Sequence, residues 1–242
     1  MEIDIFDLKD IDLRDATIID GMPSVGLVST IAANHLISTL NLDQIAVMDC
    51  DEFPPISVIY GGEPKHPARF YGSEELGLVV MFSEFTASPR LARPIVRAVR
   101  SWAEWKGCKR VISLEGVPIK SLDHREKPYV FGVGATEEER IRLLKSNIPQ
   151  LQMGVISGTT GVFLNESRLS SLDAVALLVE AHPDMPDYLG AAALIDHLGI
   201  LLKLDIDSKV LIGKGKEQQG YIEDLREEAD RVTASGSMAM YR

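Results

Sequence analysis

Short apolar segments alternate with longer helical patterns along most of this chain, and this alternation limits the possible folds more than any other feature. The strand-like segments are Ala16–Asp20, Gln44–Asp49, Gly77–Phe82, Lys109–Leu114, Tyr129–Gly134 and Gly154–Ser157. The helical patterns cover about Leu27–Leu40, Pro89–Lys106, Thr136 to just before Pro149, Ser171–Ala181 and Asp187–Leu202. Strands that alternate with helices favour the α/β class, with a mostly parallel sheet covered by helices on both faces.

Turn and cap residues mark several boundaries between these segments. Thr136, followed three residues later by Glu139, predicts a capping box at a helix start. Gly107 suits the C-terminal end of the helix before it, and Ser24 could cap the start of the first helix. Two further short antiparallel strands are predicted over Ile56–Tyr60 and Ala68–Tyr71.

Composition and charge restrict the class of protein. The chain has 242 residues, 45% of them hydrophobic, and a net charge of −11, which suits one globular domain with a helical appendage. A nucleic-acid binder usually carries a basic stripe, and we expect none here, so DNA and RNA are not expected partners.

Cys50 and Cys108 have neither metal-site nor disulfide spacing, which favours buried free thiols. The acidic N-terminus has no secretion signal, and the longest apolar run, Leu189–Leu204, contains Asp196 and His197, so we expect a soluble cytoplasmic protein without a membrane span.

Two glycine-rich loops could hold an anion. Gly21 and Gly26 have the spacing of a phosphate loop, but Leu27 and Val28 stand where that loop needs lysine and serine or threonine. The second loop, Ser157–Gly161, offers backbone N–H groups and two hydroxyls. Tight turns and close helix–sheet packing need glycines at the same places, and this second interpretation is favoured.

Two carboxylates follow strand ends, where α/β enzymes place catalytic groups. Glu84 and Glu115 could act as general acid and base, or they could be ordinary solvated loop carboxylates. The histidines show no ligand spacing, and we interpret His35 and His197 as packed or capping side chains. The acidic run Asp49–Glu52 is interpreted as a solvated turn. We therefore expect neither a metal nor a cofactor.

The C-terminal part of the chain has a different character. Between Lys214 and Val232 an apolar helix face carries Ile222, Leu225, Ala229 and Val232, and it could pack on its own domain or against a partner. After a run of small residues the chain ends in Met240, Tyr241 and Arg242. A flexible apolar side chain, a tyrosine ring and a terminal carboxylate together form a compact docking signature. An ordinary disordered chain end is the alternative.

Several of these stretches occur in a specific order. They are Gly21–Gly26 before a helix, Phe53–Pro55 before a strand, Gly154–Gly161, and Pro186 ahead of the alanine-rich run Ala191–Leu194. Together they resemble the proteasome assembly chaperone family (PAC2-like), in particular its archaeal homologues. The resemblance spans about Ala16–Asp207, and Ser24 departs from the glycine found in many relatives.

The resemblance implies a three-layer αβα fold similar to nucleoside phosphorylases, no enzymatic activity, and binding to proteasome α-subunits or the α-ring. It also implies that the hydrophobic-Tyr-X ending, here Met240, Tyr241 and Arg242, enters pockets between α-subunits, and that a homo-oligomer presents several such tails. We expect a core domain over residues 1–207 and a helical segment with a docking tail over residues 208–242. The alternative function is an enzyme or binding protein for nucleosides or phosphate-containing ligands that uses the two glycine-rich loops.

Overall fold

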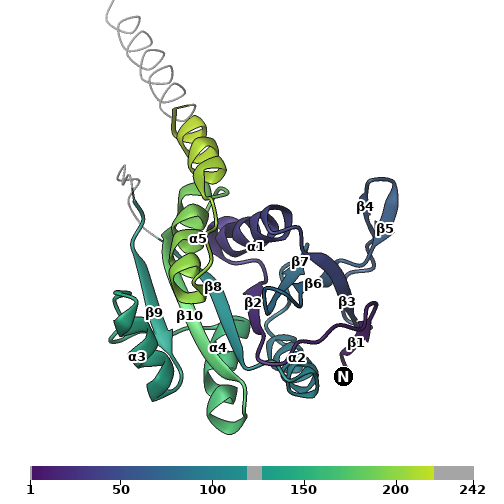
Figure 1. The fold of residues 1–242 in the computed structure, drawn as a ribbon. Coiled ribbons are helices and arrows are strands. Elements are labelled where there is room, and N and C mark those ends of the chain that lie inside the picture. Colours follow the sequence, from purple (N-terminus) through teal and green to yellow (C-terminus); the bar gives the residue numbers. More distant parts are fainter. Residues whose placement is uncertain (1, 119–126, 221–242) are drawn as a thin grey trace, which may run out of the picture.

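An eight-stranded sheet forms the centre of the computed structural model, which describes residues 2–118 and 127–220 (Figure 1). The strand order is β1-β3-β6-β7-β2-β8-β10-β9. In chain order the strands of this sheet are β1 (Asp4–Asp7), β2 (Thr17–Gly21), β3 (Asp43–Asp49), β6 (Ala68–Ser73), β7 (Leu78–Ser83), β8 (Arg110–Pro118), β9 (Val130–Gly134) and β10 (Asp173–Ala181).

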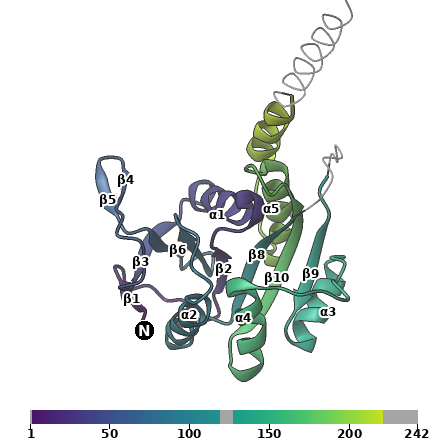
Figure 2. The ribbon, with the colours of Figure 1, turned by 180° about the vertical axis from the view of Figure 1, so that it is seen from behind.

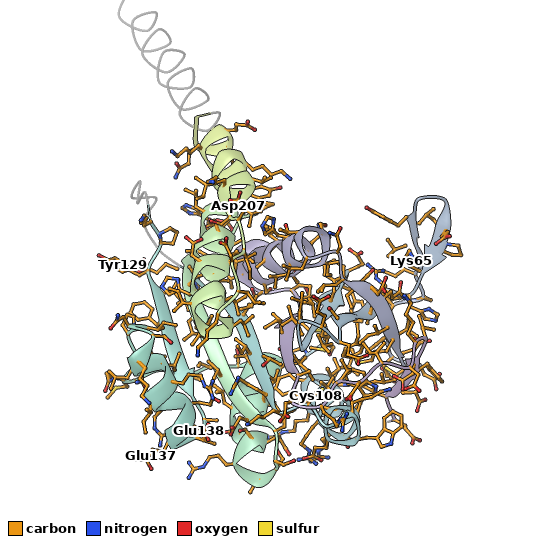
Figure 3. All side chains as sticks on the ribbon, viewed as in Figure 1. Lys65, Cys108, Tyr129, Glu137, Glu138 and Asp207 are labelled. Carbon is orange, nitrogen blue, oxygen red and sulfur yellow. The ribbon has the colours of Figure 1, made fainter. Side chains whose placement is uncertain are left out.

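Parallel pairing is concentrated in the middle of the sheet. The pairs β7–β2, β2–β8 and β8–β10 are parallel, whereas β1–β3, β3–β6, β6–β7 and β10–β9 are antiparallel, so the sheet is mixed. A separate ribbon, β4 (Val58–Tyr60) with β5 (Glu63–Lys65), lies outside the sheet and stands off the body, where Lys65 marks it in Figure 3. The predicted α/β class is confirmed, and its parallel part is the four-strand centre.

Helices cover both faces of the sheet. They are α1 (Val28–Thr39), α2 (Ala92–Lys106), α3 (Glu137–Lys145), α4 (Gly158–Glu166) and α5 (Tyr188–Leu202), with short 3-10 turns at Val25–Leu27 and Ser167–Leu169. α1 and α5 pack together on one face, and α2 and α4 pack together on the other (Figures 1 and 2). Neighbouring residues of β2 point into the two different cores: Ile19 lies in the cluster under α1 and α5, and Ile18 in the cluster under α2. The predicted αβα layering is therefore confirmed.

Two secondary-structure predictions in the second half of the chain are wrong. The segment Ser171–Ala181, expected as a helix, contains β10, which pairs with β8 on one side and β9 on the other. The segment Gly154–Ser157, expected as the last core strand, has no regular structure and leads into α4. Val155 in this segment is 98% exposed, so it contributes nothing to the core.

The predicted caps and hairpin are only partly confirmed. Thr136 accepts a hydrogen bond from the amide of Glu139, as a capping residue should, and Gly107 ends α2 with a positive φ of 77°. Ser24 does not cap α1, because a 3-10 turn precedes the helix and the side chain of Ser24 bonds elsewhere. The strand near Tyr60 pairs with β5 across a two-residue glycine turn, whereas Ala68–Ser73 belongs to the main sheet.

The last described segment is a helix over residues 209–220 that begins against α5. Ser208 donates a 2.6 Å hydrogen bond to Asp196, and Leu211 is buried in the same core cluster as α1 and α5. The ammonium of Lys214 lies 5.7 Å from the ring centre of Tyr188. The start of this helix is thus fixed to the body, and Asp207 marks the place in Figure 3. Within the described ranges, no helix is both long and apolar enough to cross a bilayer.

Candidate functional site

The two glycine-rich loops meet at one edge of the sheet, above two carboxylates. Asp20, at the end of β2, accepts hydrogen bonds from the hydroxyls of Ser113 (3.1 Å) and Thr159 (3.2 Å). Glu115 on β8 accepts a 3.0 Å hydrogen bond from the hydroxyl of Thr160. These bonds connect the first turn of α4 to the carboxyl end of β2 and to the middle of β8. The carboxyl ends of parallel strands form the edge where α/β folds commonly bind ligands.

The loop from Gly21 to Gly26 is packed against its own chain. Gly26 has a φ of 65°, and a Cβ there would lie 2.8 Å from the carbonyl oxygen of His182. The amide of Asp187 donates a 2.8 Å hydrogen bond to the carbonyl oxygen of Gly26. On the other side, the hydroxyl of Ser24 accepts a 3.3 Å hydrogen bond from the amide of Gly116. The glycines of this loop therefore serve close packing, as the favoured interpretation of the sequence predicts.

Burial determines the charge of the two carboxylates. It raises the pKa of Asp20 to about 6, although hydrogen bonds from the amide of Met22 and from Ser113 and Thr159 oppose the shift. Burial also raises the pKa of Glu115 to about 7, and the nearby charge of Asp20 adds to the shift while the bond from Thr160 opposes it. The pair therefore takes up protons near neutral pH.

Glu84 lies apart from this pair, contrary to the idea of a catalytic pair with Glu115. It accepts a 2.6 Å hydrogen bond from the guanidinium of Arg69, whose side chain is buried. That guanidinium also lies 5.2 Å from the ring centre of Phe82. Glu115, for its part, lies within β8 and not beyond it, because β8 continues to Pro118. Of the two interpretations of Glu84 and Glu115, the structure therefore does not favour an acid–base pair.

The other candidate side chains are structural. His35 bonds to the carbonyl oxygen of Asp207, and His197 to the carbonyl oxygen of Ala193, each at 2.7 Å, so both are packed as predicted. Burial raises the pKa of the Cys108 thiol to about 12, and Cys108 lies beneath α2 (Figure 3). Cys50 is half-buried, and both thiols are free. Among the described residues, no group of three histidine, cysteine or acidic side chains is arranged to hold a metal.

The candidate docking residues Met240, Tyr241 and Arg242 lie outside the described residues, as does most of the predicted helix over Lys214–Val232.

Comparison with known proteins places the fold. The model of the PAC2 family matches residues 18–226, which is most of the chain. The chain belongs to the PAC2 family. A curated relative, an uncharacterised protein of Methanocaldococcus jannaschii, is 28% identical over 218 residues, covering 90% of this chain and 88% of the relative.

Two solved structures from Pyrococcus furiosus resemble this PAC2-family chain. PbaA, described as an archaeal homolog of proteasome-assembly chaperone, has a TM-score of 0.84 and 30% identity, with all of both chains covered. PbaB, described as an archaeal proteasome activator, has a TM-score of 0.82 at 20% identity, covering 93% of this chain and 99% of PbaB. The likeness to PbaB shows the fold alone, while the PbaA match extends over the whole chain.

One member of the carboxylate pair was not singled out from the sequence. Asp20 ends an otherwise apolar strand immediately before a glycine, and an acidic residue in that position is the signal that could have identified it. Its hydroxyl partner Thr159 lies far away in sequence, in the second glycine-rich loop. The parallel pairing of β2 with β8 places Asp20 opposite Ser113, and the start of α4 brings Thr159 to the same carboxylate.

The raised pKa values predict a specific pH dependence of stability. A carboxyl with a higher pKa in the folded state binds its proton more tightly there than in the unfolded state. Its contribution to the free energy of unfolding is therefore fully present below its ordinary pKa of 3.8 or 4.5. That contribution is lost as the pH rises through about 6 to 7. A shift of about two pKa units corresponds to on the order of 3 kcal/mol. We expect an Asp20→Asn/Glu115→Gln variant to become more stable relative to the natural chain as the pH rises from about 5 to about 8.

Urea unfolding of both proteins across this pH range measures the effect. The difference between the two profiles isolates the two carboxyls, because every other titrating group is common to both proteins. Each Asn or Gln side chain keeps one acceptor oxygen, and the serine and threonine hydroxyls can rotate to accept from the new amide groups. Parallel profiles over the whole range would show that burial does not perturb these groups.

Proposed function

We propose that this PAC2-family protein binds proteasome α-subunits, or the ring that they form, as an assembly chaperone or activator without catalytic activity of its own. The observation that supports this most directly is the match to PbaA, because it covers both chains completely at 30% identity. The packing at the candidate site adds support: the first glycine loop and both buried carboxylates are engaged by the chain's own amide and hydroxyl groups.

The proposed contact is made by Met240, Tyr241 and Arg242. Met240 buries a flexible apolar side chain in a groove of the partner. Tyr241 fills a pocket between adjacent α-subunits with its ring and hydrogen-bonds through its hydroxyl. The terminal carboxylate of Arg242 pairs with a lysine in the pocket. In this proposal, residues 1–207 form the body of the protein, and residues 208–242 carry the docking tail.

The proposal includes a homo-oligomer in the cytoplasm. Several tails on one assembly reach several pockets of one ring, so that modest individual affinities combine through a high effective concentration. The net charge of −11 adds an electrostatic contribution, because it favours approach to a basic surface of the partner.

The experiment is a pull-down of recombinant proteasome α-subunits and of assembled α-rings with the full-length protein. We expect a version without the last three residues to retain no detectable binding, and Tyr241→Ala to weaken binding by a factor of about 30 or more, as for a central aromatic anchor. The far-ultraviolet circular dichroism and melting temperature should not change, since the proposed body, residues 1–207, does not include these three residues.

A matched control is available on the body. Tyr60 is a tyrosine that is 75% exposed on the β4–β5 ribbon, so Tyr60→Ala removes the same chemical group from a different place. It should leave binding unchanged. If the truncated protein binds as well as the full-length one, the tail has no role; if neither binds, the proposed partner is wrong.

A further inference from the structure

The exposed face of α2 carries a continuous row of arginines. Arg90, just before the helix, and Arg93, Arg97 and Arg100 within it follow one another at intervals of three or four residues, which places them on one side of a helix. Arg90, Arg93 and Arg97 are exposed and Arg100 is partly buried. We call these four residues the arginine ridge. It corrects the expectation that the chain has no basic stripe.

Half of the ridge already holds a carboxylate. Glu166, at the end of α4, accepts a 2.6 Å hydrogen bond from Arg100, and its other oxygen lies 4.0 Å from the guanidinium of Arg93. Arg90 and Arg97 make no ion pair or hydrogen bond with any part of the described chain. Two guanidinium groups thus remain without a counter-charge in a protein whose acidic side chains outnumber its basic ones by 36 to 25.

A groove runs beside the unpaired half of the ridge. Arg97 and Ser101 of α2 line one wall, and Ile3, Asp4 and Ile5 at the outermost strand β1 line the other, around a volume of about 390 Å³. The walls are held together at one end, where Asp7 accepts a 3.0 Å hydrogen bond from the indole of Trp102 and pairs with Lys106 at 2.8 Å. The groove is therefore preformed, and its lining combines apolar side chains with one cation, Arg97, and one carboxylate, Asp4.

We propose that the arginine ridge binds an acidic polypeptide segment of a partner protein, with its carboxylates on Arg90 and Arg97 and its backbone along the groove. Guanidinium groups form strong, charge-assisted hydrogen bonds with carboxylates, and Arg100 of α2 already makes one such bond to Glu166 of α4. A nucleic acid fits less well, because its binding depends on neutralising many phosphates, and only two guanidinium groups of the ridge are unpaired within the described chain. This contact is separate from the terminal residues and does not depend on them.

The test uses the full-length protein and a fluorescein-labelled peptide of alternating glutamate and serine, followed by fluorescence polarisation. We expect binding that weakens as salt is raised, and a loss of at least about tenfold in affinity for Arg90→Ala/Arg97→Ala. Arg90→Lys/Arg97→Lys retains the charge but not the planar fork, and should give an intermediate affinity. The matched peptide with glutamine in place of glutamate should not bind.

Lys145→Ala/Lys216→Ala is the matched control. It removes the same charge from exposed positions on α3 and on the helix over residues 209–220, so it should leave peptide binding unchanged. An equal loss in this control would reduce the effect to net charge and overturn the proposal. The absence of peptide binding would also overturn the proposal. So would a labelled oligothymidylate that binds more tightly than the peptide and loses affinity in Arg90→Ala/Arg97→Ala, because the ridge would then bind phosphates. None of these variants is at the chain end, so a failure here leaves the proposed tail contact intact.

Discussion

A Gly116→Ala variant is expected to lose on the order of 3 kcal/mol of the free energy of unfolding. A Cβ at this position of β8 would lie 2.1 Å from the carbonyl oxygen of Val25 and 2.9 Å from its carbonyl carbon. The Val25 backbone cannot easily move away, because its neighbour Ser24 is held on two sides. The hydroxyl of Ser24 lies 2.8 Å from that of Ser29, and it accepts from the Gly116 amide. The added methyl group would therefore push β8 away from the loop that contains Val25.

Urea unfolding and the melting temperature measure this loss, which for a chain of this size corresponds to roughly 6–12 °C. Gly213→Ala is the matched control. A Cβ at Gly213 has no heavy atom within 4 Å, and the residue lies in the helix over residues 209–220. It should leave stability unchanged or raise it by about 0.5–1 kcal/mol, because alanine is the better helix former. If Gly116→Ala behaved like Gly213→Ala, the close contact between loop and strand would not exist in solution.

A Glu139→Ala variant is expected to lose about 3–5 kcal/mol, because it leaves a buried charge without its partner. Glu139 has a fully buried side chain and accepts a 2.7 Å hydrogen bond from Arg110, whose side chain is 10% exposed. The sequence predicts that Glu139 turns back to its own helix start as part of a capping box. Instead its carboxylate joins α3 to the first residue of β8. The neighbouring Glu137 and Glu138, labelled in Figure 3, are both exposed.

Two variants test whether the loss comes from the unpaired charge. Glu137→Ala removes an exposed carboxylate from the same helix turn, and should change stability by no more than about 0.5 kcal/mol. An Arg110→Met/Glu139→Met variant removes both charges of this pair and keeps most of the volume. Arg142, which lies 3.2 Å from the other oxygen of Glu139, is partly exposed and stays hydrated, so the variant should recover most of the stability. If the double variant were as unstable as Glu139→Ala, lost packing and not the lost ion pair would be the cause. Urea unfolding of all variants at one pH provides the measurement.

The central βαβ units could be predicted from the sequence, but β10 could not. Asp173–Ala181 is rich in alanine and leucine, and β10 is paired on both sides and buried on both faces, so its residues do not alternate in polarity. Periodicity alone cannot separate such a run from a buried helix. The opposite error at Gly154–Ser157 arose because Val155 and Ile156 favour strands. That preference depends on a partner and a buried face, which this segment lacks within the described structure.

Only those parts of the candidate site that depend on local sequence could be predicted. Both glycine loops and Glu115 were identified from local spacing, and the fold brings them to one edge. Local spacing does not single out Asp20, and it cannot show that Glu84 lies apart from Glu115, because their partners Thr159 and Arg69 are determined by the tertiary fold. Helical spacing alone predicts the arginine ridge. Which of its arginines are unpaired depends on the tertiary fold, because Glu166 contacts Arg93 and Arg100 from another helix.

The ribbon of β4 and β5 offers a place to attach a reporter. Its turn residues Gly61 and Gly62 both have positive φ, and no heavy atom lies within 4 Å of a Cβ built at either. Its two strands pair only with each other, and no strand of the main sheet depends on them. A fluorophore or spin label inserted between the two glycines should leave the rest of the fold intact. The separation of such labels on neighbouring copies, or from a label on an α-subunit, would then report how the protein sits on its partner.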